Sequence, residues 1–400
     1  MKKLLSVVFV LVMVLAAAMC VQAQGELVVK DESDYVHMTM DELYQEALKE
    51  AAEGKTLVAY SNSSSVSKSA ALFQEAFPGI PVEGTKIKAD ALEEKIPLEY
   101  EGSPYVDVIV MSDSVGSIYL DWYKKGYVTA YYPDAITDLD PRYSAYGLPI
   151  TIEGDVWYYN TTAFPDGCPV TNWWDLVEMK EDGTSVYTIL VHPISNLSTS
   201  SLLTNMVLHA DQLEADYLEK YGEPLEYTYP DDLGVEENNA GYEYLYRLSQ
   251  LKMTFIGDGD EIVEAVANST SDKPVLGLAS AGKIGNRDDN GWPIAWVTEL
   301  APYVSGQNTN YSFIVPGTDN PALARFFVRY MMGGDDGSGD GYKQVMKEGA
   351  WSVRDDYNNK KNPFTLAESG AVPLNMEGIY ENYLDVADFW TYWHDMSPNK

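Results

Sequence analysis

The feature that most constrains this fold is a strand, a polar turn and a helix in residues 56–77. Residues 56–60 (TLVAY) form a short apolar run, partly β-branched, of the length expected for a buried strand. The turn 61–65 (SNSSS) leads into a helical pattern with apolar residues such as Val66 and Phe73. The first turn of a helix has unpaired N–H groups and the positive end of the dipole, so hydroxyls clustered there favour an oxygen-rich ligand. The alternative is that one serine caps the helix and the others only fill the loop.

The same order of elements continues along the first half of the chain. Residues 89–99 have helical spacing, and Pro97 is expected to end that helix. Residues 106–111 (VDVIVM) are the next buried strand, and the polar turn 112–114 (SDS) follows them. Strands that alternate with helices predict a parallel α/β architecture. Ligands of open α/β sheets bind beyond the carboxyl ends of the strands, where both polar turns fall.

The pattern restarts in the second half, which predicts a second lobe. Residues 187–191 (YTILV) are a predicted strand, 192–199 a polar turn and 200–210 a helix whose start is again rich in hydroxyl groups. A further buried strand, 275–279, ends in the turn 280–283 (SAGK). Two lobes therefore present similar helix starts, and we expect these to face one cleft.

The N-terminus predicts export. Residues 1–23 contain a basic start, an apolar stretch and the small-residue cleavage site VQA, which is the pattern of a secretory signal peptide. Lipid attachment at Cys20 is an open alternative, but the bulky Met19 before it does not favour this modification. The expected location is the periplasm or the outer face of the cytoplasmic membrane.

The strongly negative net charge of the chain argues against a nucleic acid partner. Cleavage after Ala23 removes two lysines and no acidic residue, so the net charge moves from -34 to -36. Binding to a nucleic acid backbone requires clustered Lys and Arg, so no nucleic acid partner is expected. Cys168 is the one cysteine left after cleavage, which excludes an intramolecular disulfide. Stability must come from apolar cores, and 400 residues suggest two of them.

Several short stretches, in this order, resemble the extracellular solute-binding proteins of ABC importers. The branch that is most similar includes binders of ferric iron, polyamines, phosphonates and sugar phosphates. The stretches that carry the resemblance are residues 57–61 (LVAYS), 107–109 (DVI), 147–149 (GLP), 157–160 (WYYN), 173–176 (WWDL), 314–317 (IVPG), 320–322 (NPA) and 352–354 (SVR).

The resemblance implies a two-lobed, type 2 periplasmic-binding-protein-like α/β fold, with hinge strands near residues 146–150 and 298–303 and a ligand cleft between the lobes. It implies an ABC transporter permease as partner, a monomer, and no enzyme activity or cofactor. The expected domain boundaries are a signal peptide at 1–23, a leader with a short helix at 24–53, the first lobe at 54–148, the second lobe at 149–300, and a return to the first lobe with C-terminal helices at 301–400.

The polar turns and their neighbours supply the predicted ligand-binding residues. These are Ser61, Ser63, Ser64, Ser65, Ser112, Asp113, Glu153, Trp157, Ser198, Thr199, Ser200, Ser280, Gly282 and Lys283. Serine hydroxyls, a glycine amide and an ammonium group suit an anion, so the expected ligand is a small oxygen-rich molecule such as a sugar phosphate or a phosphonate. No metal ligand is predicted.

Other ligands and functions stay open at this point. The ferric-binding relatives have two adjacent tyrosines where this chain has residues 280–283, which disfavours iron. A polyamine would need acids and aromatic walls, which Asp113, Glu153 and Trp157 could supply. A secreted glycan-active enzyme and a surface adhesin are the alternatives from other classes. The calcium-like stretch 336–341 (DGSGDG) has Lys347 where such a loop needs a glutamate, so a turn is expected there.

Overall fold

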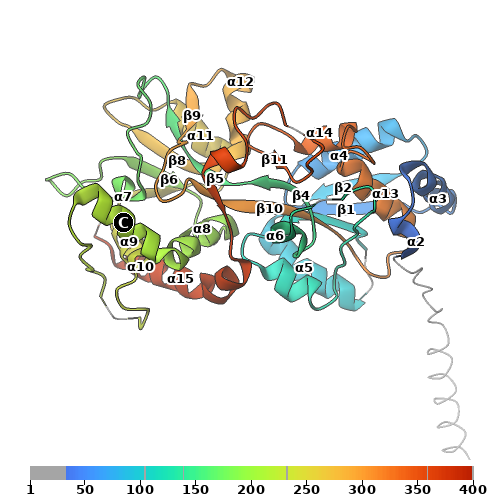
Figure 1. Cartoon of the computed structure of the whole chain (residues 1–400), viewed down its shortest axis with the longest axis horizontal. Coiled ribbons are helices and arrows are strands. Elements are labelled where there is room, and N and C mark those ends of the chain that lie inside the picture. The colour runs from blue at the N-terminus through green and yellow to red at the C-terminus, as the bar shows by residue number, and fades with distance from the viewer. Residues whose placement is uncertain (1–32, 103–104, 138, 231–232, 358, 399–400) are drawn as a thin grey trace, which may run out of the picture.

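Two lobes lie side by side along the long axis of the molecule (Figure 1). The structure is a computed structural model that describes residues 33–102, 105–137, 139–230, 233–357 and 359–398. The expected signal peptide, residues 1–23, lies outside the described residues, as does Cys20. In the described part, we find no helix with the length and apolar character needed to cross a bilayer.

The first lobe is built on a mixed seven-stranded sheet with the order β11-β4-β10-β3-β1-β2 and β12 paired to β10. Its strands are β1 (Leu57–Ser61), β2 (Val82–Lys86), β3 (Val108–Ser112), β4 (Leu148–Glu153), β10 (Ser305–Ile314), β11 (Trp351–Ser352) and β12 (Ala371–Pro373). The helices of this part are α2 (Ser33–Val36), α3 (Met40–Ala52), α4 (Ser65–Ala76), α5 (Ala89–Gly102), the π-helix η1 (Ile118–Tyr123), α6 (Pro141–Ser144), α13 (Pro321–Met331), α14 (Asp340–Val345) and η3 (Ala367–Ser369). Strands β1, β2 and β3 are parallel, whereas β10 runs antiparallel to β3 and β4.

Strand β1 is apolar along its length because both of its faces are covered. Leu57 and Ala59 belong to the core that includes Phe73 of α4, whereas Val58 and Tyr60 belong to the core on the opposite face. A strand buried on both faces has a continuous apolar run in place of an alternating one. The predicted strand and helix of residues 56–77 are therefore observed as β1 and α4.

The second lobe is built on a five-stranded sheet with the order β7-β6-β8-β5-β9. Its strands are β5 (Asp155–Asn160), β6 (Thr188–Val191), β7 (Met253–Phe255), β8 (Val275–Ser280) and β9 (Ile294–Trp296). The helices around it are α7 (Trp173–Leu176), α8 (Leu197–Leu208), α9 (Ala210–Tyr221), α10 (Ala240–Ser249), α11 (Gly259–Ala267), η2 (Ala281–Gly285), α12 (Asn286–Asn290) and the C-terminal α15 (Met376–Met396). Helix α15 packs on α8 and α10 through Val386, Phe389 and Trp390, so the chain ends on the second lobe.

The chain leaves the first sheet at the end of β4 and enters the second sheet at Asp155, with only Gly154 between them. A Cβ atom on Gly154 would lie 2.4 Å from Oγ of Ser305, where β10 begins. The outgoing and returning segments therefore pass very close together here, and glycine allows that approach. Because β4 belongs to the first sheet, this crossing lies a few residues after the lobe boundary predicted at residue 148.

Two predicted helix ends differ from the structure. Pro97 does not end α5, which continues to Gly102. Proline has a helix-compatible φ and removes one N–H donor, and the buried side chains of Leu92 and Ile96 hold this helix on the sheet. Helix α8 starts at Leu197 in place of residue 200, because the side chain of Asn196 caps it.

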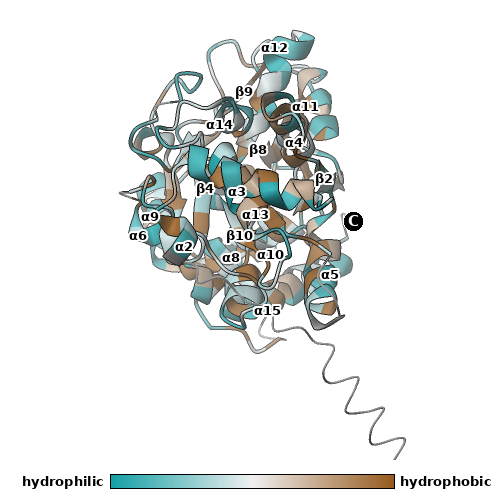
Figure 2. Ribbon diagram, turned by 90° about the vertical axis from the view of Figure 1, so that its right-hand side faces the viewer, coloured by the Kyte–Doolittle hydropathy of each residue, from teal (hydrophilic) through white to brown (hydrophobic). Residues whose placement is uncertain are grey.

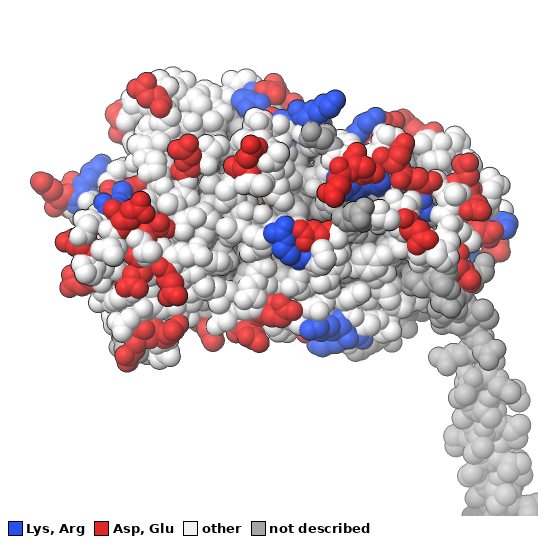
Figure 3. Space-filling model, in the orientation of Figure 1, with Lys and Arg blue, Asp and Glu red and all other residues white. Residues whose placement is uncertain are grey.

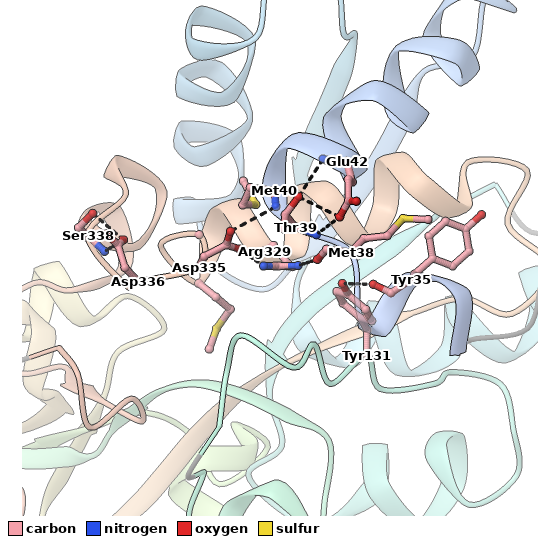
Figure 4. A network of polar contacts seen from close by, with 12 residues as sticks. Tyr35, Met38, Thr39, Met40, Glu42, Tyr131, Arg329, Asp335, Asp336 and Ser338 are labelled. Atoms are coloured by element: carbon pink, nitrogen blue, oxygen red, sulfur yellow. Dashed lines mark hydrogen bonds and ion pairs between the residues drawn. The ribbon is translucent and has the colours of Figure 1, made fainter.

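The segment that precedes β1 is fixed to the first lobe by a buried arginine (Figure 4). Arg329 of α13 is 1% exposed, donates to the carbonyl oxygen of Met38 and forms an ion pair with Asp335. Thr39 and Glu42 form a capping box at the start of α3. Helix α3 then lies across the outer end of the first lobe (Figure 2), in contact with α13.

Asp107 joins distant segments of the first lobe. It is 5% exposed, and its Oδ2 accepts a hydrogen bond from the N–H of Val58 at 2.7 Å. The side chain of Asn320 donates to both carboxylate oxygens at 3.2 and 3.1 Å, and the hydroxyl of Thr318 donates to Oδ1. Burial raises the pKa of Asp107, while these hydrogen bonds act against that rise. The carboxylate thus ties the start of β1 to the turn before α13.

We expect Asp107→Ala to destabilise the protein by about 3–5 kcal/mol, because it leaves several buried donors without an acceptor. The measurement is urea unfolding followed by circular dichroism. The matched control is Asp319→Ala, which removes the same group from an exposed position and should change stability by about 0.5 kcal/mol or less. Equal unfolding midpoints for the two variants would contradict this role of Asp107.

Candidate functional site

A cavity of about 510 Å³ lies between the two lobes. From the first lobe it is lined by Ser61, Asn62, Ser63, Ser64, Ser65, Val66, Lys68, Ser69, Lys86, Val110, Ser112, Ile150, Thr151, Glu153, Asn308, Asn310, Met331, Gln344, Val345 and Lys347. Gly154 lines it at the crossing, and Asp155, Ser198, Ser280 and Lys283 line it from the second lobe. This volume suits a small molecule rather than a protein or nucleic acid chain.

The end of β1 and the start of α4 form one wall. The buried Ser61 accepts a hydrogen bond at Oγ from the N–H of Ser63 at 3.0 Å, and Oγ of Ser63 accepts one from the N–H of Ser65 at 3.2 Å. Ser64 occupies the N-cap position of α4, but its side chain makes no capping hydrogen bond. The N-terminal end of α4 therefore points its positive dipole end toward the cavity without a side-chain cap.

The registers of the first sheet place the other polar groups of this lobe in a row. Ser61 on β1 is paired with Lys86 on β2 and with Val110 on β3. On the far side of β3, Asn310 of β10 lies opposite Ser112, and on β4 it lies opposite Thr151. Asn308 lies opposite Glu153. The polar edge of the sheet thus runs from Lys86 at one side to Glu153 at the other.

Two carboxylates flank Gly154, at the crossing between the lobes. Oε2 of Glu153 accepts a hydrogen bond from the hydroxyl of Ser280 at 2.9 Å and lies 3.6 Å from Nζ of Lys347. Burial raises the pKa of Asp155, while the hydroxyl of Ser198 lowers it. Glu153 therefore has protein partners from both lobes, whereas the hydroxyl of Ser198 is the hydrogen-bond partner of the Asp155 carboxylate.

Helix α8 presents its start from the second lobe. The side chain of Asn196 accepts hydrogen bonds from the N–H groups of Ser198 at 3.0 Å and of Thr199 at 3.4 Å. Ser198 lines the cavity, whereas the side chains of Thr199 and Ser200 point into the lobe and are 5% and 2% exposed. The two facing helix starts are thus unequal, since α8 is capped by its own side chain and α4 is not.

Four lysines line the cavity, against two carboxylates. Nζ of Lys283 lies 2.7 Å from Asp260, and Lys347 lies near Glu153. Lys68 and Lys86 are exposed, and neither has an ion-pair partner among the residues that the structure describes. The side of the cavity formed by α4 and β2 consequently carries positive charge that the protein itself does not balance.

Nine of the predicted residues are brought together in this cavity. They are Ser61, Ser63, Ser64, Ser65, Ser112, Glu153, Ser198, Ser280 and Lys283. Whether they bind a ligand stays a prediction. The other predicted residues, Asp113, Trp157, Thr199, Ser200 and Gly282, do not line it.

Packing and hydrogen bonds explain why Asp113, Trp157 and Gly282 do not line the cavity. Asp113 is 2% exposed and accepts hydrogen bonds from the N–H groups of Ile118 at 3.3 Å and Tyr119 at 2.9 Å, so it satisfies the first turn of η1. Trp157 is 2% exposed and lines, with Thr199, a separate cavity of about 20 Å³ inside the second lobe. Gly282 is covered by Lys347, whose side chain would lie 2.3 Å from a Cβ at that position.

Sequence reasoning missed several lining residues that carry charge or amide groups. These are Asn62, Lys68, Lys86, Asp155, Asn308, Asn310, Gln344 and Lys347. Lys86 ends a strand parallel to β1, so the rule that located the serine turns could also have found it. Lys347 follows α14 and reaches the cavity only through tertiary packing, for which the local sequence contains no signal.

A loop of the first lobe contacts the second lobe beside the cavity. Gly349 has φ +85°, and a Cβ atom there would lie 2.4 Å from the backbone of Ala281. Next to this contact, Nη2 of Arg287 donates to Oε2 of Glu348 at 2.9 Å. Glycine is required by both the positive φ and the close backbone approach. The loop after α14 therefore links the two lobes directly.

Metal ligation has little support in the described residues. No group of three or more His, Cys, Asp or Glu side chains that could hold a metal ion is present among them. In the calcium-like stretch, Oδ1 of Asp336 accepts hydrogen bonds from the N–H and hydroxyl of Ser338 at 3.0 and 2.7 Å (Figure 4). Those contacts make a tight turn, as the sequence predicts.

Comparisons with known proteins agree in fold. A family model described as bacterial extracellular solute-binding protein matches residues 59–335. Among solved structures, iron-bound HitA from Pseudomonas aeruginosa has a TM-score of 0.63 at 16% identity, and the match covers 84% of this chain and 99% of that chain. The substrate binding protein of an ABC transporter from Agrobacterium tumefaciens has a TM-score of 0.63 at 14% identity, with 86% and 96% covered. The periplasmic binding protein AfuA from Actinobacillus pleuropneumoniae, bound to exogenous fructose-6-phosphate, has a TM-score of 0.57 at 14% identity, with 86% and 99% covered. A search of the curated proteins finds no match.

The buried carboxyl group of Asp113 leads us to expect that the stability of the protein depends on pH. Burial raises the pKa of Asp113 to about 7 from its ordinary value near 4. Between those values the folded protein holds a proton that the unfolded chain releases, so stability falls as the pH rises through this window. We expect the free energy of unfolding of the wild type, relative to Asp113→Asn, to decrease by up to about 4 kcal/mol between pH 4 and pH 8, at ~1.4 kcal/mol per pKa unit.

The measurement is urea unfolding of both proteins at several pH values. The readout is the difference between them, which cancels the titration of groups that do not interact with Asp113. A difference that stays constant across the window would contradict the proposed protonation of Asp113.

Proposed function

The chain belongs to the bacterial extracellular solute-binding proteins, and from this premise we propose that it is an ABC transporter receptor for a small anionic, oxygen-rich molecule. The family consists of non-enzymatic receptors, as the sequence predicts. A sugar phosphate or a phosphonate is the ligand class that this proposal names. The proposal also includes delivery to a permease, action as a monomer, and a location in the periplasm or at the outer face of the cytoplasmic membrane.

The observation that carries the proposal is that basic residues outnumber acidic ones in the cavity lining, although acidic residues outnumber basic ones in the chain. The chain has 61 acidic and 27 basic residues, and acidic side chains are spread over both lobes on the face seen in Figure 3. The cavity reverses this ratio, since four lysines line it against two carboxylates. Lys68 and Lys86, without partners among the described residues, stand beside the uncapped start of α4. Lysine ammonium groups and open N–H groups together favour an anion.

The alternative ligands fit these side chains less well. Ferric iron favours hard oxygen donors such as phenolates, and the lining residues of the cavity in the described chain include no tyrosine or histidine. A polyamine would meet Lys68 and Lys86, whose positive charges repel it. Iron-bound HitA and the fructose-6-phosphate complex of AfuA have similar folds at 16% and 14% identity, so their ligands do not decide between these classes.

We expect purified protein to bind an organic phosphate or phosphonate at a single saturable site. Isothermal titration calorimetry with fructose 6-phosphate, methylphosphonate, inorganic phosphate, spermidine and ferric citrate checks this, with sodium citrate as the control for the last. A bound anion should also raise the Tm, because a ligand at 100 times its Kd adds about 2.7 kcal/mol of stability. Saturable binding of spermidine or iron alone would contradict the proposal, and native mass spectrometry of the purified protein would reveal a ligand that co-purifies.

We expect Lys68→Met and Lys86→Met each to weaken binding of the best anion by about 10-fold or more, because a hydrogen bond to a charged group contributes about 1.5–3 kcal/mol. The measurement is calorimetry. Lys252→Met is the matched control, since Lys252 is exposed, does not line the cavity and changes the net charge equally. If both cavity variants bind the anion with wild-type affinity, Lys68 and Lys86 do not contribute to its binding.

A further inference from the structure

Asp155 is the first residue of β5, and it lines the cavity from the second lobe. Its backbone is fixed from two directions. It is paired with Ser280 on β8, and its carbonyl oxygen accepts a hydrogen bond from the hydroxyl of Ser305 at 2.6 Å. The carboxylate therefore stands on a rigid part of the crossing between the lobes and not on a free loop.

The two charged groups that act on Asp155 have opposite signs. Glu153 is a like charge nearby, and His192 is the basic group on the side of α8. Nδ1 of His192 donates to the carbonyl oxygen of Ile256 at 2.8 Å, so that nitrogen is engaged elsewhere. No lysine or arginine of the described chain forms an ion pair with Asp155, in contrast to Glu153, which is within 3.6 Å of Lys347.

A desolvated carboxylate without a cation is costly for a folded protein. Such groups are normally paired, or they take up a proton. Burial raises the pKa of Asp155, and the hydroxyl of Ser198 and the charge of His192 act against that rise, so the carboxylate has a hydroxyl partner but no ion pair with a lysine or arginine of the described chain. A cationic group on a bound molecule would supply the missing partner, in the same way that Lys283 serves Asp260 at 2.7 Å.

The unbalanced charges of opposite sign lie at different sides of the cavity. Lys86 ends β2, and Glu153 ends β4 just before Asp155. The strand order β2-β1-β3-β10-β4 separates the backbones of β2 and β4 by four strand spacings, roughly 19 Å at ~4.8 Å each. Lysine side chains shorten that span, so a molecule of a few bonds can reach both sides within about 510 Å³.

We propose that Asp155 binds an ammonium group of the ligand, so that the molecule carried in this cavity is zwitterionic, with its anionic group near Lys68 and Lys86. This inference rests on the proposed function, because it assigns the second end of the same anionic ligand. It narrows the ligand class to amino-substituted phosphonates or phosphates.

The test uses four probes of similar size. These are propylphosphonate, with an anion only; 2-hydroxyethylphosphonate, with an anion and a hydroxyl; 2-aminoethylphosphonate, with an anion and an ammonium; and 1,3-diaminopropane, with ammonium groups only. Calorimetry measures each probe on the full-length mature protein. We expect the wild type to bind 2-aminoethylphosphonate at least about 10-fold more tightly than propylphosphonate.

In Asp155→Asn this preference should disappear while the affinity for propylphosphonate stays within about threefold of wild type. Asp155→Ser is a second variant in case the first folds poorly, and thermal unfolding without ligand checks both. Asp289→Asn is the matched control, because it removes an equal charge from an exposed position on the same lobe.

Each outcome of these titrations either supports or overturns the ammonium site at Asp155. An unchanged preference in both Asp155 variants, or equal wild-type affinity for the hydroxyl and ammonium probes, would overturn it. If no phosphonate binds but the diamine binds through Asp155, the anionic function fails and the ammonium site stands. If the phosphonates bind and depend on Lys68 but not on Asp155, the function stands and this inference fails.

Discussion

Backbone hydrogen bonds between β1 and its two parallel neighbours decide where the first lobe places its polar groups. They set Ser61 beside Lys86 and Val110, and so bring two strand ends and the start of α4 to one edge. A slip of one residue would turn every side chain of β1 to the opposite face of the sheet. Asp107 holds the other end of the strand through the N–H of Val58, so that the register is fixed away from the cavity as well as beside it.

The net charge of the chain and the charge of the cavity lining have opposite signs. A net charge of -34 produces a negative field around the chain, and this field opposes the approach of an anion. Lysines that lack protein partners act over short distances, where screening by salt is weakest. Pairing Lys283 with Asp260 and Lys347 with Glu153 leaves the excess positive charge at Lys68 and Lys86. The acidic surface therefore repels an anion, whereas the lysines of the cavity attract it.

The fold class followed from the sequence, because buried strands and amphipathic helices have clear local periods, and the two-lobed α/β architecture is confirmed. The serine turns were placed correctly at strand ends for the same reason. Asp113 follows a strand too, but it serves the N–H groups of η1, which local sequence cannot distinguish from a ligand. Trp157 is two residues beyond Asp155 on β5 and is buried beneath the second lobe's helices. Lys347 reaches the cavity only through long-range packing, so no local pattern could predict it.

Contact between the lobes also includes aromatic rings. Trp296 of β9 and Trp351 of β11 belong to different sheets, yet their ring centroids are 6.5 Å apart, and Phe364 lies 6.0 and 6.2 Å from them. Rotation of one lobe against the other must separate these indoles or change their angle. Such a rotation would therefore change the surroundings of two of the chain's nine tryptophans, and their fluorescence would report the change without an added dye.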